Sequence, residues 1–199
     1  MGKLTKRLRR FSKPARDVLL RPLAPLVSAQ KSARLRGDDF TVKRVRKHVL
    51  VDLVYRHCPA RDVVIGEVGT RGGRTTEHLL RYCPQITRIY AVDIVRPGPN
   101  SPLNRLPQVT FLHGPSVEMA KQIPDGALDL VFIDADHSEA AVREDIRAWL
   151  PKVRQDGVIA GHDYGSRNHP GVKIAVDEAF ARRREPLHLE ANKVWWTVR

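Results

Sequence analysis

The sequence has little cysteine and no long hydrophobic run, and each lack excludes a class of protein. Two cysteines, Cys58 and Cys83, are too few for a disulfide framework, so nothing points to an oxidising compartment. A membrane span needs roughly 18–20 consecutive apolar residues, and the longest apolar stretch, residues 18–27, is interrupted by Arg21 and Pro22. The sequence therefore has the signature of neither a disulfide-rich nor a transmembrane protein, and we expect a cytoplasmic protein.

Acidic residues are scarce in the first quarter of the chain. The formal net charge is +13 over 199 residues. Fifteen lysines and arginines against three aspartates give residues 1–48 a charge of +12, whereas residues 49–199 hold twenty basic against nineteen acidic residues. The 42% hydrophobic content is ordinary for one globular domain. We therefore expect a basic, partly helical N-terminal arm, residues 1–48, followed by one nearly neutral domain, residues 49–199.

The arm has the pattern of a basic amphipathic helix. Lysines and arginines separate apolar residues that recur at three- and four-residue steps, namely Leu4, Leu8, Phe11 and Ala15. Pro14 should kink this helix. Residues 1–20 could lie on an anionic membrane surface, contact RNA phosphates or form a mitochondrial-type presequence. An extension without stable structure fits the pattern as well.

After the arm, short apolar runs alternate with amphipathic ones, which is the pattern of a parallel sheet with helices on both faces. Strands are expected at residues 63–68, 88–92, 109–112, 128–133 and 157–160. The clearest helices are expected at residues 41–57, 138–150 and 172–182. Residues 187–190 and 194–198 have the pattern of two tightly joined strands. The predicted fold class is α/β: a Rossmann-like, doubly wound sheet, mostly parallel, with a C-terminal antiparallel hairpin and helices on both faces.

A glycine-rich turn follows the first expected strand and opens a helix. It runs from Glu67 through Gly69 to Gly73, and a doubly wound sheet binds nucleotide-like ligands at this position. Glycine lets the backbone approach such a ligand closely. Asp93 ends the second strand, 26 residues after Glu67, where an acidic side chain can accept hydrogen bonds from ribose hydroxyls. Together the two features predict a nucleoside site.

Charge bears on which nucleoside cofactor fits this turn. A dinucleotide places a pyrophosphate over the turn, where Glu67 would repel it, and Arg71 stands where the G-x-G-x-x-G pattern has its second glycine. S-adenosylmethionine instead carries an ammonium and a sulfonium, which a carboxylate favours. Arg71 and Arg74 argue the other way, because either could meet a phosphate. The charges therefore favour S-adenosylmethionine and leave a dinucleotide open.

Polar groups also follow the fourth and fifth strands, as Asp134-Ala-Asp136-His137 and as His162-Asp163. Because neighbouring parallel strands lie about 4.8 Å apart, groups at their carboxyl ends can converge. Two carboxylates and an imidazole suit a divalent cation such as Mg²⁺ or Mn²⁺. We expect Asp134 and Asp163 to be functional and Asp136 only to cap the next helix. His162 could be a ligand, a general base or a structural histidine.

These motifs, in this order along residues 60–198, resemble class I S-adenosylmethionine-dependent methyltransferases. More narrowly, they resemble the small branch related to catechol, caffeoyl-CoA and macrolide-sugar O-methyltransferases. The segments that carry the resemblance are Glu67-x-Gly69-x-x-x-Gly73-Arg-Thr-Thr, Ala-Val-Asp93, Asp134-Ala-Asp-His137, Gly-His162-Asp163-Tyr and His169-Pro-Gly-Val. As an ensemble they are specific, although each alone is not.

The resemblance implies a role for each motif. Glu67, Gly69 and Gly73 would line the methionine part of the cofactor. Asp93 would accept hydrogen bonds from its ribose hydroxyls, and Gly114 and Ser116 would border its adenine. Metal-dependent relatives hold their ion with residues that match Asp134, His162 and Asp163. This sequence departs from the family at Pro115, where an acidic residue is common, and at His162, because such relatives usually add a carboxylate or an amide beside the aspartate.

The implied reaction is transfer of the methyl group of S-adenosylmethionine to a hydroxyl of a small molecule or glycan. The hydroxyl would be activated by Mg²⁺ or Mn²⁺ at Asp134, His162 and Asp163, or by His162 as general base, with Asp134 and His162 as the catalytic residues. An RNA methyltransferase that uses the basic arm is an alternative, although only Phe11 adds an aromatic ring to the basic run. A non-catalytic module that binds S-adenosylmethionine is the other.

Overall fold

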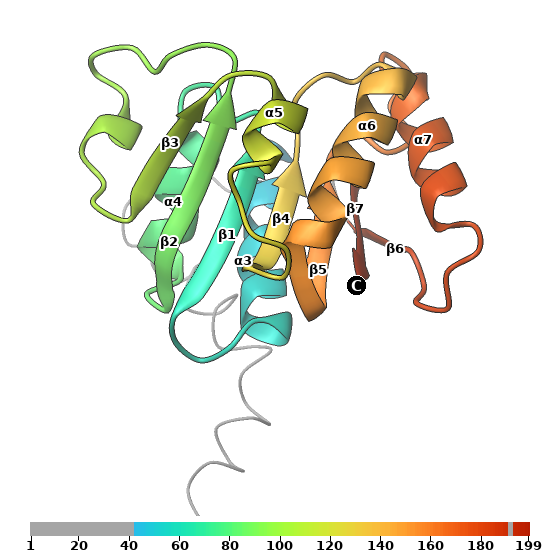
Figure 1. Ribbon diagram of the computed structural model, residues 1–199, viewed down its shortest axis with the longest axis horizontal. Coiled ribbons are helices and arrows are strands. Elements are labelled where there is room, and N and C mark those ends of the chain that lie inside the picture. Colours follow the sequence, from blue (N-terminus) through green and yellow to red (C-terminus); the bar gives the residue numbers. More distant parts are fainter. Residues whose placement is uncertain (1–41, 191–192) are drawn as a thin grey trace, which may run out of the picture.

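A computed structural model describes residues 42–190 and 193–199, which form one seven-stranded sheet with helices on both faces (Figure 1). The first 41 residues of the expected arm lie outside the described residues. The strands are β1 (Val63–Val68), β2 (Ile86–Asp93), β3 (Val109–His113), β4 (Leu128–Ile133), β5 (Val153–Gly161), β6 (His188–Glu190) and β7 (Val194–Val198). The helices are α3 (Val42–His57), α4 (Arg74–Tyr82), α5 (Ser116–Ala120), α6 (Glu139–Trp149) and α7 (Pro170–Phe180), with short 3₁₀ turns η1 (Pro102–Asn104) and η2 (Leu150–Lys152).

The strand order is β3-β2-β1-β4-β5-β7-β6. The first five strands pair in parallel, whereas β7 is antiparallel to both β5 and β6. This arrangement confirms the expected mostly parallel sheet with a C-terminal hairpin. The strands that follow β1 are added on one side of it, as β2 and β3, and the next strands are added on its other side, as β4 and β5. The carboxyl ends of β1 and β4 therefore flank the position where doubly wound folds bind ligands.

Two apolar cores, one on each face, hold the helices on the sheet. On one face, Leu50 and Leu53 of α3 and Leu79 of α4 belong to a buried cluster with β-strand residues such as Ile65. On the other, buried residues of α6 and α7 pack against the side chains of alternating strand positions such as Val131. Side chains of a strand alternate between faces, so consecutive apolar residues in β4 serve both cores. Continuous apolar strands therefore require helices on both sides.

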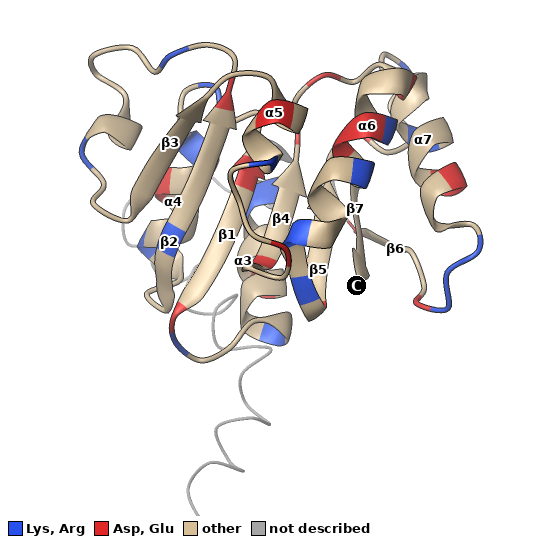
Figure 2. Cartoon of the chain, viewed as in Figure 1, with Lys and Arg blue, Asp and Glu red and all other residues tan. Residues whose placement is uncertain are grey.

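Helix α3 spans the expected boundary at residue 48, because its second half is part of the core. The helix expected at residues 41–57 is thus confirmed. Figure 2 shows basic and acidic residues scattered over the described elements, as the near-neutral count for residues 49–199 requires. No helix in the described part of the chain is long and apolar enough to cross a membrane.

Strand β5 starts four residues before the expected 157–160 strand, at Val153, which pairs with Leu128 of β4. The register shifts between these pairs, and Gly157 occupies the irregular part. A Cβ on Gly157 would lie 2.6 Å from the Val153 side chain and 2.9 Å from the Asp129 carbonyl oxygen. The bulge therefore requires glycine. Because the bulge interrupts the apolar pattern of the strand, the sequence analysis did not include residues 153–156 in it.

Candidate functional site

The glycine-rich turn between β1 and α4 lies directly against the end of β4. Gly69 has φ +87°, and a Cβ there would lie 2.2 Å from the carbonyl oxygen of Asp134. Gly73 has φ +72°, and a Cβ would lie 2.5 Å from the Leu103 side chain. Only glycine combines such a backbone conformation with such close contact. The turn therefore brings the expected cofactor residues beside the end of β4.

Asp93 is anchored to the same turn. One carboxylate oxygen accepts a hydrogen bond from the Arg71 backbone N–H at 2.6 Å, and the other accepts one from the Val95 backbone N–H at 2.9 Å. A carboxylate has about four acceptor positions, so these two bonds orient the group and leave capacity for a ligand. The position at the end of β2 is the one expected for a ribose acceptor.

Glu67 is buried beneath the turn, with only 2% of its surface exposed. The Thr76 hydroxyl donates a hydrogen bond to the Glu67 carboxylate. Burial raises the pKa of this carboxyl from 4.5 to about 7, although the Thr76 hydrogen bond and the charges of Arg46 and Lys47 act in the opposite direction. The ionised form of Glu67, which would favour a cationic ligand, is therefore costly to maintain when no such ligand is bound.

The turn after β3 holds the expected adenine residues. The Gly114 backbone N–H donates to the Asp93 carbonyl oxygen at 3.0 Å. The Ser116 hydroxyl accepts a 2.7 Å hydrogen bond from the indole N–H of Trp149 and also interacts with Asp145. Burial raises the pKa of the Asp145 carboxyl to about 6. Ser116 thus joins this turn to α6, and the hydroxyl expected to border adenine already has protein partners.

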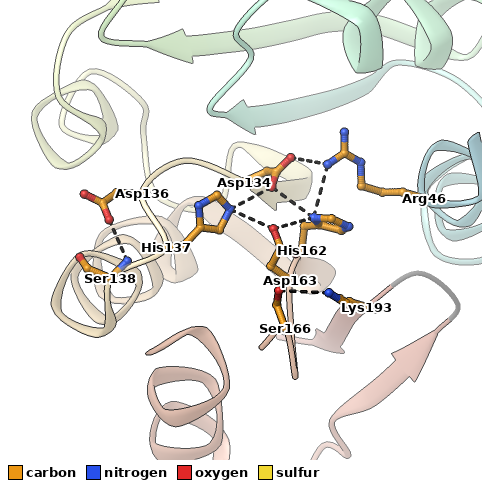
Figure 3. A network of polar contacts seen from close by, with 9 residues as sticks. All are labelled: Arg46, Asp134, Asp136, His137, Ser138, His162, Asp163, Ser166 and Lys193. Atoms are coloured by element: carbon orange, nitrogen blue, oxygen red, sulfur yellow. Dashed lines mark hydrogen bonds and ion pairs between the residues drawn. The ribbon is translucent and has the colours of Figure 1, made fainter. Parts of the chain in front are cut away.

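Asp134, His162 and Asp163 converge at the ends of β4 and β5, as the sequence predicted (Figure 3). The two strands are neighbours, with Ile133 opposite Gly161. The Nδ1 atom of His162 lies 3.1 Å from Asp163 Oδ2 and 3.5 Å from Asp134 Oδ1. Asp163 has φ +60°, a left-handed conformation that aspartate tolerates better than most residues. The three residues can therefore act on the same ligand.

Two further residues complete the cluster. His137 places Nε2 3.2 Å from Asp163 Oδ2 and 3.5 Å from Asp134 Oδ1. Arg46 of α3 places Nη1 2.6 Å from Asp134 Oδ2 and 3.4 Å from His162 Nδ1 (Figure 3). His137 belongs to the Asp134-Ala-Asp-His137 motif that carries the family resemblance, but the sequence analysis assigned no role to its side chain. Nothing in the sequence pattern could have placed Arg46 here, because it lies 88 positions before Asp134.

Asp136 does not cap α6 itself, as the sequence analysis expected, but holds the cap residue Ser138 in place. Its carboxylate accepts a 2.7 Å hydrogen bond from the Ser138 backbone N–H, and this bond lowers the pKa of Asp136. Ser138 is the N-cap of α6, with its hydroxyl accepting from the Ala141 N–H at 3.4 Å. Asp136 therefore shapes the loop that carries Asp134 and His137.

A pocket of about 500 Å³ opens beside the cluster, between the start of α6 and the loop before α7. The rings of His137 and His169 stack within it, with centroids 4.2 Å apart. Such a volume is in the range of small-molecule sites. The pocket is lined by Asp136, His137, Ser138, Glu139, Asn168, His169, Pro170 and Gly171.

Comparison with known proteins agrees with the fold. Residues 67–164 match the model of a methyltransferase domain family. No curated protein matches the chain in sequence. The crystal structure of CalS11, a TDP-rhamnose 3′-O-methyltransferase of calicheamicin biosynthesis, is 18% identical with a TM-score of 0.62, and the match covers 97% of this chain and 99% of CalS11.

Two other solved structures resemble the chain at similar identity. The O-methyltransferase NovP is 17% identical with a TM-score of 0.61, covering 84% of this chain and 87% of NovP. The mycinamycin-pathway methyltransferase MycE, solved with Mg and SAH, is 18% identical with a TM-score of 0.51, covering 68% of this chain and 45% of MycE. At such identities the similarity shows the fold. Together with the matched domain, it confirms the sequence-based identification of a class I S-adenosylmethionine-dependent methyltransferase.

Proposed function

We propose that this methyltransferase moves the methyl group of S-adenosylmethionine to a hydroxyl of a small molecule or glycan. The observation that carries the proposal is the contact between the glycine-rich turn and the polar cluster, since Gly69 packs on the Asp134 backbone. A cofactor on the turn would therefore lie beside the groups that activate a hydroxyl. Similarity to CalS11, which acts on a TDP-linked sugar, and to NovP supports an oxygen acceptor.

The cofactor would extend along the carboxyl edge of β1, β2 and β3. In our assignment its methionine part lies over Gly69 and Gly73, with Glu67 beneath them as the carboxylate that favours a cationic ligand. Asp93 accepts hydrogen bonds from the ribose hydroxyls, because the turn already orients its carboxylate. Adenine borders the turn at Gly114 and Ser116, mainly through the backbone, since the Ser116 hydroxyl is bound by Trp149.

Methyl transfer forms a bond from the acceptor oxygen to the methyl carbon as the carbon–sulfur bond breaks, and the electron pair stays on sulfur. The acceptor proton passes to the imidazole of His162, which lies beside the carboxylates of Asp134 and Asp163. General-base catalysis of this kind contributes about 10²–10⁴-fold in rate, and alignment of the reacting atoms contributes further.

The same residues fit a divalent cation. Single ligand atoms of Asp134, His162 and Asp163 all lie within 4.8 Å of one another, and two carboxylates with one imidazole form a reasonable donor set for Mg²⁺ or Mn²⁺. When bound, such an ion would act as a Lewis acid on the acceptor hydroxyl. Arg46, already 2.6 Å from Asp134, would share that carboxylate with the ion.

The acceptor fits the pocket beside His137 and His169. Its volume of about 500 Å³ suits a small molecule or one to two sugar units. Its lining combines two imidazoles, an asparagine and carboxylates with the apolar ring of Pro170, which matches hydroxyl groups on a compact ring better than an extended apolar chain. The pocket therefore favours a small polar acceptor.

For the basic arm we propose a separate role at an anionic membrane surface on the cytoplasmic side. Residues 1–48 carry a charge of +12, against +1 in the remainder. Each lysine or arginine near an anionic bilayer contributes about 1 kcal/mol, so the arm alone supplies enough attraction for peripheral binding. RNA binding by the arm remains the competing outcome.

The proposed reaction is tested with methyl-labelled S-adenosylmethionine and separated host fractions of small molecules, glycans and RNA. We expect label in a small-molecule or glycan fraction. Label in RNA alone would establish the RNA methyltransferase instead, and cofactor binding without transfer to any fraction would establish a non-catalytic module. Repeating the assay with EDTA and then excess Mg²⁺ or Mn²⁺ separates the two activation modes, because general-base catalysis by His162 alone survives chelation.

The cofactor assignment is tested by calorimetry. Asp93→Ala should lower the affinity for S-adenosylmethionine about tenfold or more, because it removes the acceptor for the ribose hydroxyls. Asp125→Ala is the matched control, since Asp125 is an exposed aspartate that pairs with Lys152 away from the turn. Equal affinities for Asp93→Ala and the unaltered chain would refute the assignment.

A further inference from the structure

A second group of possible metal ligands lies beside Asp134 and His162. It consists of His137, Asp163 and His169, which each offer one ligand atom, and these atoms all lie within 4.8 Å of one another. His137 Nε2 is 3.2 Å from Asp163 Oδ2 (Figure 3). Neighbouring ligand atoms of a tetrahedral Zn²⁺ ion with bonds of about 2.1 Å are about 3.4 Å apart. Small rotations of these side chains therefore suffice to bring all three to one ion.

The backbone fixes the two loops that carry these residues. The Ser166 N–H donates to the Asp163 carbonyl oxygen at 3.0 Å, and the His169 N–H donates to the Ser166 carbonyl oxygen at 3.2 Å, so two consecutive turns join Asp163 to His169. The starts of α6 and α7 also touch, because a Cβ on Gly171 would lie 2.5 Å from the Glu139 backbone nitrogen. The loop before α6 and the loop before α7 are therefore held against each other before any ion binds.

Both imidazoles are oriented for a ligand. His137 Nε2 is buried and makes no hydrogen bond within the described residues, and such an atom is costly unless a ligand satisfies it. His169 is the N-cap of α7, but its side chain makes no capping hydrogen bond to that helix. The two rings stack with centroids 4.2 Å apart and line the pocket of about 500 Å³. An ion bound to both rings would satisfy His137 and lie at the wall of the pocket.

We propose that His137, Asp163 and His169 form a transition-metal site that takes Zn²⁺. It shares Asp163 with the set that the family resemblance implies, but it uses neither Asp134 nor His162. Two imidazoles and one carboxylate suit Zn²⁺ better than Mg²⁺, which prefers oxygen ligands and water. Three protein ligands leave one position of a tetrahedral ion for an oxygen of water or of the acceptor. This site goes beyond the proposed function, which requires no ion at His137 or His169.

Arg46 distinguishes the two sets electrostatically. Its Nη1 lies 2.6 Å from Asp134 Oδ2 and 3.4 Å from His162 Nδ1, so the guanidinium opposes a cation bound to those two residues. The ion pairs of Asp163 in the described part of the chain are with His137 and His162 instead. The carboxylate charge of Asp163 is therefore available to an ion on its His137 side.

The test is calorimetric titration of the metal-free, untagged full chain with ZnCl₂, without cofactor or acceptor. His169→Ala and His169→Gln should each weaken the tightest Zn²⁺ binding about tenfold or more, because each removes one of three ligands and even groups outside the ligand set contribute that much. The matched control is His162→Ala, which removes the imidazole of the family-implied set and should not weaken this binding.

Pulsed electron paramagnetic resonance of the chain with a substoichiometric amount of Cu²⁺ provides a second readout, which a merely structural role of His169 would not move. Cu²⁺ generally binds such donor sets more tightly than Zn²⁺ does, and its spectrum counts coordinated imidazoles. Two are expected in the unaltered chain and one in His169→Ala, whereas the family-implied set holds a single imidazole.

Three results would each overturn the inference: a single imidazole in the unaltered chain, equal Zn²⁺ affinity after substitution of His169, or loss of the tightest Zn²⁺ binding in His162→Ala. Absence of methyl transfer would instead refute the proposed function, because these measurements require no turnover.

Discussion

At the scale of single residues, the candidate site buries an ionisable side chain, Glu67, whose charged form the protein alone stabilises poorly. Glu67 is buried to 2% exposure with a hydroxyl as its hydrogen-bond donor. A cationic cofactor above it would stabilise the ionised form, and the pKa of about 7 places the transition in the physiological range. Such perturbed groups are typical of functional sites. The sequence suggested this carboxylate as a ligand partner but could not reveal its burial.

The raised pKa of Glu67 predicts a pH dependence of stability. Between pH 4.5 and about 7 the folded chain retains a proton that the unfolded chain releases, so the free energy of unfolding falls as pH rises through this window. The contribution is about 3 kcal/mol. The glutamine in Glu67→Gln cannot ionise. The decrease in the free energy of unfolding from pH 5 to pH 8, measured by urea denaturation, should therefore be smaller in this variant than in the unaltered chain.

The control for this measurement is Glu118→Gln, which changes an exposed glutamate paired with Lys121. Its decrease in unfolding free energy between pH 5 and pH 8 should equal that of the unaltered chain. If Glu67→Gln and Glu118→Gln behave alike, Glu67 does not titrate in the folded protein at near-neutral pH.

At the scale of elements, the site depends on how closely the β1–α4 turn approaches the end of β4. Gly69 belongs to the turn, and the Asp134 carbonyl oxygen occupies the space of its missing side chain. Helix α3, which lies on the same face of the sheet as α4, adds Arg46 to the same point. The sequence predicted the glycine-rich turn. It could not predict the contacts of Gly69 and Arg46 with Asp134, because these contacts join segments that are far apart along the chain.

Gly69→Ala should therefore be strongly destabilising. The new Cβ would meet backbone atoms at 2.2–2.7 Å in a left-handed conformation, and backbone of two strands cannot move aside cheaply. We expect a loss of about 2–4 kcal/mol in the free energy of unfolding, measured by urea denaturation, together with loss of cofactor binding.

Gly72→Ala is the matched control for that substitution, because a Cβ at Gly72 would meet nothing within 4 Å. Its effect on stability should stay within about 1 kcal/mol. An equally small effect of Gly69→Ala would contradict the close approach of the turn to β4.

At the scale of the whole molecule, charge is divided unevenly between the arm and the domain. Residues 1–48 hold nearly all of the net charge, and basic and acidic residues are interspersed over the described elements after them (Figure 2). Both the polar cluster around Asp134 and the adjacent pocket lie at the carboxyl edge of the sheet. Binding to a charged surface and methyl transfer are therefore expected to be separable properties of one chain.

This separation can be measured with vesicles that contain anionic lipid. The variant Lys6→Glu with Arg7→Glu should bind such vesicles about tenfold more weakly or worse at low salt, while methyl transfer to a water-soluble acceptor stays unchanged. The variant Arg182→Glu with Arg184→Glu removes the same charge from the domain and should retain binding. Equal losses in both variants would mean that net charge, rather than the arm, governs the attraction.

The sequence by itself determined the fold class and predicted which side chains would meet at the carboxyl edge of the sheet. Apolar runs of strand length, glycine at turns and acids at strand ends are local signals, and they predicted that Asp134, His162 and Asp163 would converge. Local signals cannot report contacts between distant segments. Only the tertiary structure decided that Arg46 neutralises Asp134, that His137 faces both carboxylates and that Ser116 is engaged by Trp149, because each depends on how the helices pack across the finished sheet.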